Sequence, residues 1–188
     1  LPIYNEQLEK EVRIAAHSAL ELFGFNHYVP MGKPILMVAC SCSIVPKWML
    51  KDCFDRTFKV FSTKTIEIPQ TSNINIEGVN LLVSSPEQAF MECLLLAKDQ
   101  YNYMDLYYIM EQLTSLRADV VQILLENIKN QRVKRMFLYM AEKAGHYWFD
   151  MLDINKINIG TSKLQLVKNG IYVNKYKITI PKELNDYE

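Results

Sequence analysis

Apolar residues recur along the chain at two spacings, one typical of helices and one typical of strands. Near the amino terminus a helical stripe is formed by Val12, Ala16, Ala19, Leu20 and Phe23. Gly24 follows this stripe and predicts the end of an amphipathic helix.

The next part of the chain is predicted to be mixed α and β. An apolar run on each side of the turn at residues 30–33 predicts a β-hairpin over residues 25–39. Pro46 opens a short predicted helix that reaches Leu50. Further strands are predicted at Thr57–Phe61, Thr65–Ile68 and Val79–Val83, with a polar connection at Pro69–Gly78.

A run of helices is predicted in the middle of the chain. Ser85 can cap the first of these helices, Pro86 suits its first position, and Gln88 can complete a capping box. The later helices are predicted at Tyr101–Leu113, Ala118–Asn130 and Gln131–Ala144, and Gly145 ends the last of them.

The carboxy-terminal part returns to a strand pattern. Strands are predicted at Lys156–Ile159, Leu164–Lys168, Ile171–Val173 and Lys175–Ile180. Asn169-Gly170 predicts a two-residue hairpin turn, because both central positions of a type I′ turn need a positive φ. The fold class predicted is α+β, with a central run of helices packed with mixed or antiparallel β-strands at both ends of the chain.

The composition is that of a globular protein, with 49% hydrophobic and 22% charged residues among 188. The longest uninterrupted apolar run, Ile35 to Cys40, is far shorter than the roughly 20 residues of a membrane-spanning helix. No secretion signal precedes the four cysteines, and none of them forms a Cys-x-x-Cys pair. We therefore expect reduced cysteines and a cytoplasmic protein.

The formal net charge of zero hides an uneven distribution along the chain. Residues 129–182 contain eleven Lys or Arg and three acids, a balance of +8, whereas residues 1–128 have a balance of −5. This asymmetry indicates an anionic partner. The predicted nucleic-acid-binding residues are Lys129, Arg132, Lys134 and Arg135. A solvated helix face is the alternative interpretation of this cluster.

Two other residue sets have a functional and a structural interpretation. The first set is Tyr101, Tyr103, Tyr107 and Tyr108. Its two interpretations are stacking on nucleic-acid bases and ordinary packing within the protein. The second set is Cys40, Cys42 and Cys53. Its two interpretations are a zinc site, formed together with the three histidines, and a group of small buried thiols. His17 is expected on a polar helix face, and His27 is expected in a strand as a structural histidine.

No catalytic or cofactor-binding motif is present in the sequence. The six glycines form neither a Gly-x-Gly fingerprint nor a P-loop, and a Gly-x-Ser-x-Gly elbow is absent. No Asp or Glu is followed by lysine two residues later, which counts against a metal-dependent nuclease of the restriction type. A Cys/His nucleophile pair stays open, because such partners meet only in space. We assign no catalytic residue, metal ligand or cofactor.

Three stretches of the chain resemble the carboxy-terminal part of the AbiEi family, antitoxins of type IV toxin–antitoxin systems linked to abortive phage infection. They are LLVSSPEQAFMECL at Leu81–Leu94, VKRMFLYMAEKAGHYWFDMLD at Val133–Asp153, and INIG with YKITIP at Ile157–Gly160 and Tyr176–Pro181. Similar stretches upstream are Ser18–Gly32 and Val45–Trp48. The chain departs from the family pattern at Gly160–Lys163, where a more glycine-rich turn is expected, and at Asn169-Gly170, where Gly-Gly is common.

The resemblance implies a non-enzymatic bacterial regulator that counteracts a nucleotidyltransferase-like toxin without a tight complex and supports autorepression. Family members usually place a winged helix-turn-helix before this domain to bind operator DNA, and no such unit precedes Ser18 here. We therefore expect residues 1–188 to be a single effector domain, with lobes 1–70 and 71–188 as a finer division. The alternatives are a divergent nuclease-like or nucleotide-processing enzyme, and a plain nucleic-acid-binding module.

Overall fold

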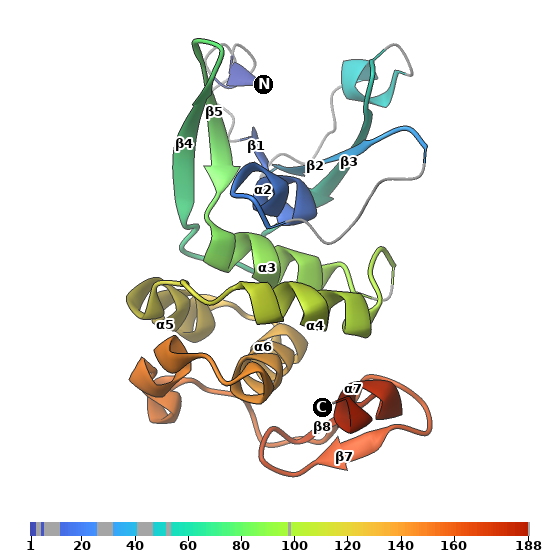
Figure 1. Ribbon diagram of the computed structural model, residues 1–188, viewed down its shortest axis with the longest axis vertical. Helices are drawn as coiled ribbons and strands as arrows, with labels where there is room; N and C mark the ends of the chain where they lie inside the picture. Colours follow the sequence, from blue (N-terminus) through green and yellow to red (C-terminus); the bar gives the residue numbers. More distant parts are fainter. Residues whose placement is uncertain are drawn as a thin grey trace.

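Two β-sheets lie at opposite ends of the molecule's longest dimension, with layers of helices between them (Figure 1). The structure is a computed structural model that describes residues 1–2, 5, 12–25, 32–40, 47–51, 54–97 and 99–187. The observed architecture is α+β, with strands at both ends of the chain, as predicted. No described helix is both long enough and apolar enough to cross a membrane.

The larger sheet is built from the amino-terminal half of the chain and has five strands in the order β3-β2-β1-β5-β4. The strands are β1 Val12–Ile14, β2 Ile35–Cys40, β3 Thr57–Ser62, β4 Thr71–Ile76 and β5 Val79–Ser84. The central strand β1 is antiparallel to β2 and parallel to β5. Because β1 and β5 are parallel, the helices that follow both strands leave from the same edge of the sheet.

The predicted first helix begins later than its apolar stripe suggests. Val12–Ile14 is the central strand, and helix α2 covers only Ala16–Leu22. All three strand residues are buried between two neighbouring strands, so this segment shows no alternation that would identify a strand. Ala16 has a φ of +48°, which turns the chain sharply from strand to helix. Gly24 follows the helix with a φ of +87°, consistent with the predicted end.

The polar connection predicted at Pro69–Gly78 is instead the edge strand β4, which pairs along its whole length with β5. Its two-residue turn is Glu77-Gly78, and both residues have a positive φ. In β4, Ile74 and Ile76 alternate with asparagines, and this alternation of apolar and polar residues is the sequence signal that indicates a strand. Thr65–Ile68 is not a strand, because Ile66 forms only a single bridge, to Ile128.

Other predictions for the amino-terminal half have different outcomes. The short helix is confirmed as the 3-10 turn η1, Lys47–Leu50, and the strand after it is confirmed as β3. The second strand of the predicted hairpin is confirmed as β2, whereas residues 26–29 of the first strand lie outside the described ones.

The helices predicted in the middle of the chain are confirmed. They are α3 Pro86–Leu95, α4 Tyr103–Gln112, α5 Ala118–Asn127 and α6 Gln131–Ala144. The Ser85 hydroxyl accepts the Gln88 backbone N–H at 3.4 Å, and Gly145 ends α6 with a φ of +68°. These helices form the main core, in which Phe137 packs against Phe90 and Trp148.

The smaller sheet lies at the far end, below α6 in Figure 1, and has the strand order β6-β8-β7. The elements after α6 are η2 Tyr147–Met151, η3 Ile154–Lys156, β6 Leu164–Gln165, β7 Ile171–Val173, β8 Ile178–Ile180 and α7 Lys182–Asp186. The predicted strand at Lys156–Ile159 is absent. The strand predicted at Ile171–Val173 is confirmed as β7, and the other two, β6 and β8, are shorter than expected.

The hairpin predicted around Asn169-Gly170 is wrong, because β6 and β7 both pair with β8 rather than with each other. Asn169 has a φ of +57°, but Gly170 does not have a positive φ. Glycine is needed at position 170 for another reason. A Cβ there would lie 2.1 Å from the Ile180 carbonyl oxygen, so only hydrogen lets the two backbones approach so closely.

Candidate functional sites: a buried ion pair and the basic segment

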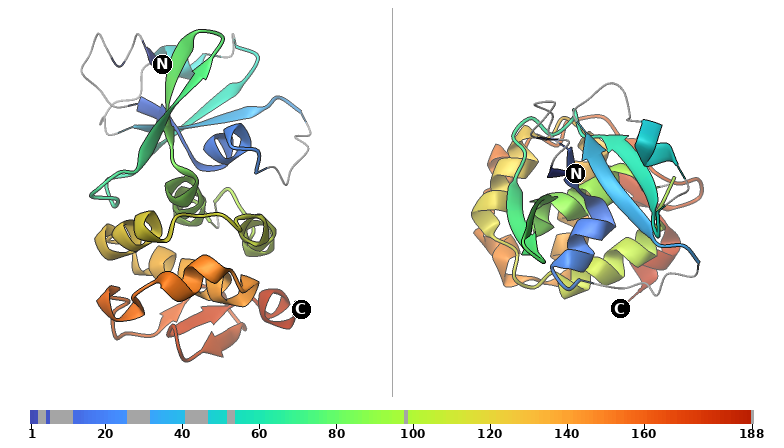
Figure 2. Two further views of the ribbon diagram at one scale, coloured as in Figure 1. Left: turned by 60° about the vertical axis from the view of Figure 1, so that its left-hand side comes forward. Right: turned by 90° about the horizontal axis from the view of Figure 1, so that it is seen from above.

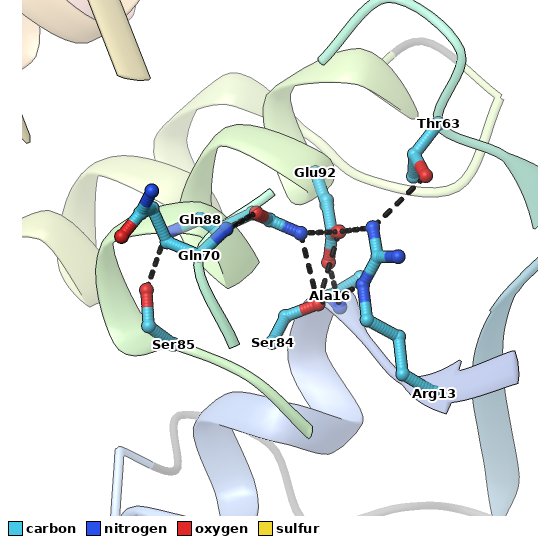
Figure 3. A network of polar contacts seen from close by, with 8 residues as sticks. All are labelled: Arg13, Ala16, Thr63, Gln70, Ser84, Ser85, Gln88 and Glu92. Atoms are coloured by element: carbon cyan, nitrogen blue, oxygen red, sulfur yellow. Dashed lines mark hydrogen bonds and ion pairs between the residues drawn. The ribbon is translucent and has the colours of Figure 1, made fainter. Parts of the chain in front are cut away.

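An ion pair lies buried where the larger sheet meets the helices (Figure 3). Arg13 comes from β1 and Glu92 from α3, and both side chains are at most 3% exposed. The Arg13 guanidinium nitrogen lies 3.0 Å from Glu92 Oε1. A buried pair of this kind is favourable only when further hydrogen bonds satisfy both groups.

Both partners have such hydrogen bonds. Arg13 Nε donates to the Ser84 hydroxyl at 2.9 Å, and a terminal nitrogen donates to the Thr63 hydroxyl at 2.9 Å. Glu92 Oε1 also accepts from the Ser84 hydroxyl at 3.0 Å and from Gln88 Nε2 at 2.7 Å. We call Arg13, Thr63, Ser84, Gln88 and Glu92 the buried polar network.

The buried polar network fixes the junction between strands and helices. The second carboxylate oxygen of Glu92 accepts the Ala16 backbone N–H at 3.0 Å, at the residue with positive φ that starts α2. Gln88 accepts the backbone N–H of Gln70 at 2.5 Å, which ties α3 to the segment before β4. Gln88 therefore points into the core and does not complete the predicted capping box. The members are at most 7% exposed, so a substrate cannot reach them and the role of the network is structural.

A second ion pair joins two helix starts. The carboxylate of Glu87, in the first turn of α3, accepts two hydrogen bonds from the Arg117 guanidinium and one from the Arg117 backbone N–H, at 3.0–3.1 Å. Burial pushes the pKa of Glu87 upward, but the hydrogen bonds from Arg117 outweigh it and leave the pKa lowered. Glu87 therefore stays ionised and holds the start of α5 against α3.

The four predicted nucleic-acid-binding residues occupy different environments at the start of α6. Lys129 is 68% exposed and forms an ion pair with Glu67 at 2.5 Å. Arg132 is half-buried, and its guanidinium donates to the Leu95 carbonyl at 2.7 Å. These two side chains keep surface that a phosphate could reach.

Lys134 and Arg135 lie inside the protein. Lys134 is 4% exposed and donates to the Glu126 carbonyl at 3.3 Å. Arg135 is 1% exposed, and its guanidinium donates to the carbonyls of Ile159, Ser162 and Lys177 at 2.7–2.9 Å. The structure therefore does not bring the four cationic groups together on one surface. Nucleic-acid binding by this set therefore stays a prediction. Lys129 and Arg132 are the two members whose side chains a phosphate could reach.

The tyrosines predicted as stacking or packing residues mostly pack. Tyr103 and Tyr107 are buried, and Tyr107 and Tyr108 form edge contacts with Tyr187. The Tyr101 hydroxyl lies 2.6 Å from His17 Nδ1. His17 is thus half-buried and bonded to Tyr101, whereas a surface position was expected.

Among the described residues, no group of three or more His, Cys, Asp or Glu is arranged to hold a metal ion. Cys42, Cys53 and His27 lie outside the described residues. Cys93 is a free thiol whose pKa is raised by burial. Cys40 is disulfide-bonded, which corrects the expectation that all four cysteines are reduced.

A family model described as "Transcriptional regulator, AbiEi antitoxin, Type IV TA system" matches residues 33–181. The chain therefore belongs to the AbiEi family of antitoxin transcriptional regulators, and the predicted resemblance is confirmed. No curated protein matches the chain at a significant level.

The fold is similar to that of a solved structure, the crystal structure of the RV2827C protein from Mycobacterium tuberculosis, with a TM-score of 0.64 at 11% sequence identity. The match covers 94% of this chain and 65% of that chain, so this chain spans less than two thirds of that protein. At this identity the likeness establishes the fold alone.

Proposed function

We propose that the chain is the effector domain of a type IV antitoxin and that it acts as one unit over residues 1–188. The observation that carries this proposal is the family match over residues 33–181. The larger sheet runs from residue 12 to residue 84 and so crosses the division between lobes at residue 70. One hydrophobic cluster contains residues from Ile14 to Leu184, which supports a single cooperative unit.

In this role the domain counteracts a nucleotidyltransferase-like toxin encoded beside it. The test is growth of a bacterial host that expresses the neighbouring gene, with and without the full protein. Relief of growth arrest is expected with the protein and with its Lys51→Ala variant, whose altered side chain is exposed. Continued arrest in the presence of soluble, folded protein would overturn the proposal.

The domain also supports autorepression by adding phosphate contacts beside an operator-binding unit. Lys129 and Arg132 are the proposed contacts, since both keep accessible cationic surface. The Lys129→Ala/Arg132→Ala variant should bind its own promoter duplex more weakly, and the salt dependence of binding should become shallower. The Lys47→Ala/Lys51→Ala variant, which alters two exposed lysines in and just after η1, is the matched control. Unchanged promoter affinity would remove these two residues from the interface.

We further propose that the domain works by binding and not by catalysis, in the bacterial cytoplasm where operator DNA lies. The buried polar network brings ionisable and polar side chains together in the described part, but it is closed to substrate. Its carboxylate is fully engaged by four hydrogen-bond donors. Addition of divalent metals should therefore not produce cleavage of DNA or RNA, and metal-dependent cleavage lost in a single Asp or Glu variant would contradict this.

A further inference from the structure

The carboxy-terminal sheet and its turns form a segment without acids. Residues 154–182 contain six lysines and neither Asp nor Glu. Lys156 pairs with Asp153 at 3.2 Å, and Lys175 pairs with Glu142 on α6. In the described part of the chain, no ion pair is formed by Lys163, Lys168, Lys177 or Lys182. The segment therefore carries four uncompensated positive charges.

One face of the smaller sheet is covered by the protein and the other is open. Ile178 and Ile180 of β8 are fully buried, and α6 packs against this strand. Between them Thr179 points to the opposite face, where it stands in register with Gln165 of β6 and Tyr172 of β7. Gln165 and Tyr172 are exposed. Figure 2 shows this sheet at the end of the molecule, with the helices on one side of it only.

An aromatic ring and a cation lie next to each other on the open face. Tyr172 is 39% exposed, although it lies in the middle of its strand. The Lys163 ammonium lies 5.2 Å above the Tyr172 ring centroid, in cation–π geometry. Gln165 and Thr179 beside them offer neutral hydrogen-bonding groups. Polar, cationic and aromatic groups are thus interleaved on one surface.

A buried cation beneath the same strands adds to the positive field. The Arg135 guanidinium is held by the carbonyls of Ile159, Ser162 and Lys177, and no carboxylate pairs with it in the described part. Burial lowers the pKa of Arg135, but a guanidinium in a protein remains charged. A charge fixed in low dielectric is poorly screened by salt and strengthens the attraction of this end of the molecule for anions.

We propose that the open face of β6, β7 and β8 binds single-stranded nucleic acid, with the lysine ammoniums on phosphates and Tyr172 stacked on a base. A polyanion matches the acid-free segment, and an aromatic ring beside a lysine suits a chain of alternating phosphates and bases. Paired bases in a duplex are not available for stacking on a flat protein face, so the exposed ring selects unpaired strands. This surface is separate from Lys129 and Arg132 and goes beyond the proposed regulatory function.

The test is fluorescence polarisation of the full chain with labelled 12-nucleotide oligothymidylate, a 12-nucleotide uridine RNA and a 20-base-pair duplex of random sequence. Single strands should bind more tightly than the duplex. The Lys163→Ala/Lys168→Ala/Lys182→Ala variant should bind single strands at least tenfold more weakly, with a slope against salt reduced by up to about 2 for three lost phosphate contacts. Tyr172→Ala should weaken binding about 5- to 100-fold, whereas Tyr172→Phe should retain it.

The matched control is Lys47→Ala/Lys51→Ala/Lys64→Ala, which removes three exposed lysines near the larger sheet and should bind as the unaltered protein does. All the altered side chains are exposed, and an unchanged melting temperature confirms that each variant is folded. Equal binding of duplex and single strands, or affinity unchanged in the first lysine variant or in Tyr172→Ala, would overturn the proposal. The growth assay measures antagonism of the toxin and the polarisation assay measures binding of nucleic acid, so failure of either proposal is recognised separately.

Discussion

The two ends of the molecule use charged residues in opposite ways. In the buried polar network at the larger sheet, Arg13 and Glu92 are almost completely buried and fully hydrogen-bonded. At the smaller sheet, four exposed or half-exposed lysines have no acidic partner in the described part of the chain. Paired buried charges specify how strands and helices meet, whereas unpaired surface charges contribute little to stability and are available to a partner.

The largest effect should come from breaking the buried ion pair. Glu92→Ala leaves the Arg13 guanidinium buried without its partner and should lower the free energy of unfolding by about 3–5 kcal/mol. Urea denaturation measures this change. The Arg13→Met/Glu92→Met double variant should lose less than the single variant, because no charge is left uncompensated. A loss below about 1 kcal/mol for Glu92→Ala would show that the network does not hold the junction.

The next largest effect should come from the buried cation under the smaller sheet. Arg135→Met removes the hydrogen bonds that the guanidinium donates to the carbonyls of Ile159, Ser162 and Lys177, which should cost roughly 2–4 kcal/mol of unfolding free energy. Arg132→Met removes a half-buried residue with one hydrogen bond and should cost clearly less. Equal losses in the two variants by urea denaturation would argue against the structural role of Arg135.

A smaller effect is expected at the close approach of two backbones. Gly170→Ala places a methyl group against the Ile180 carbonyl, and the forced shift should cost about 1–3 kcal/mol. Asn169→Gly is the matched control, because its φ of +57° suits glycine and no group is added. Thermal unfolding distinguishes the two variants. An alanine as stable as glycine at position 170 would contradict the tight pairing of β8.

The smallest effect concerns pH and the Glu87–Arg117 pair. The folded-state pKa of Glu87 lies below its ordinary value of 4.5, so its stabilising contribution is complete above that pH and disappears as pH falls through the folded pKa. Arg117 is more than half exposed, so Arg117→Ala should cost only about 1 kcal/mol at pH 7. The cost should shrink below pH 4.5. A cost that grows in acid, measured by urea denaturation at several pH values, would contradict this assignment.

The sequence predicts elements whose signals are local and misses those that depend on distant contacts. Ser85-Pro86 and Gly145 mark the ends of α3 and α6, and both helices lie where these signals predict. The central strand β1 has no alternation because both of its faces are buried, so its apolar residues were attributed to a helix.

The environments of the candidate site residues also depend on distant contacts that the sequence does not show. Lys129 and Arg135 are equally cationic in the sequence, but only the packing of α6 against the smaller sheet shows that Arg135 is buried. The buried polar network joins residues up to 79 positions apart, and sequence spacing has no signal for such a network. The acid-free stretch at residues 154–182, by contrast, is visible in the sequence, while the sheet register shows which of its side chains share a face.

Hydrogen exchange with and without a single-stranded 12-nucleotide oligomer tests the central comparison most directly, because it reports both ends of the molecule in one experiment. The account predicts added protection of backbone amides in residues 162–182 and no change in residues 84–95, where the buried polar network already protects the backbone. Added protection confined to residues 129–135, or no added protection in the smaller sheet at saturating oligomer, would contradict it.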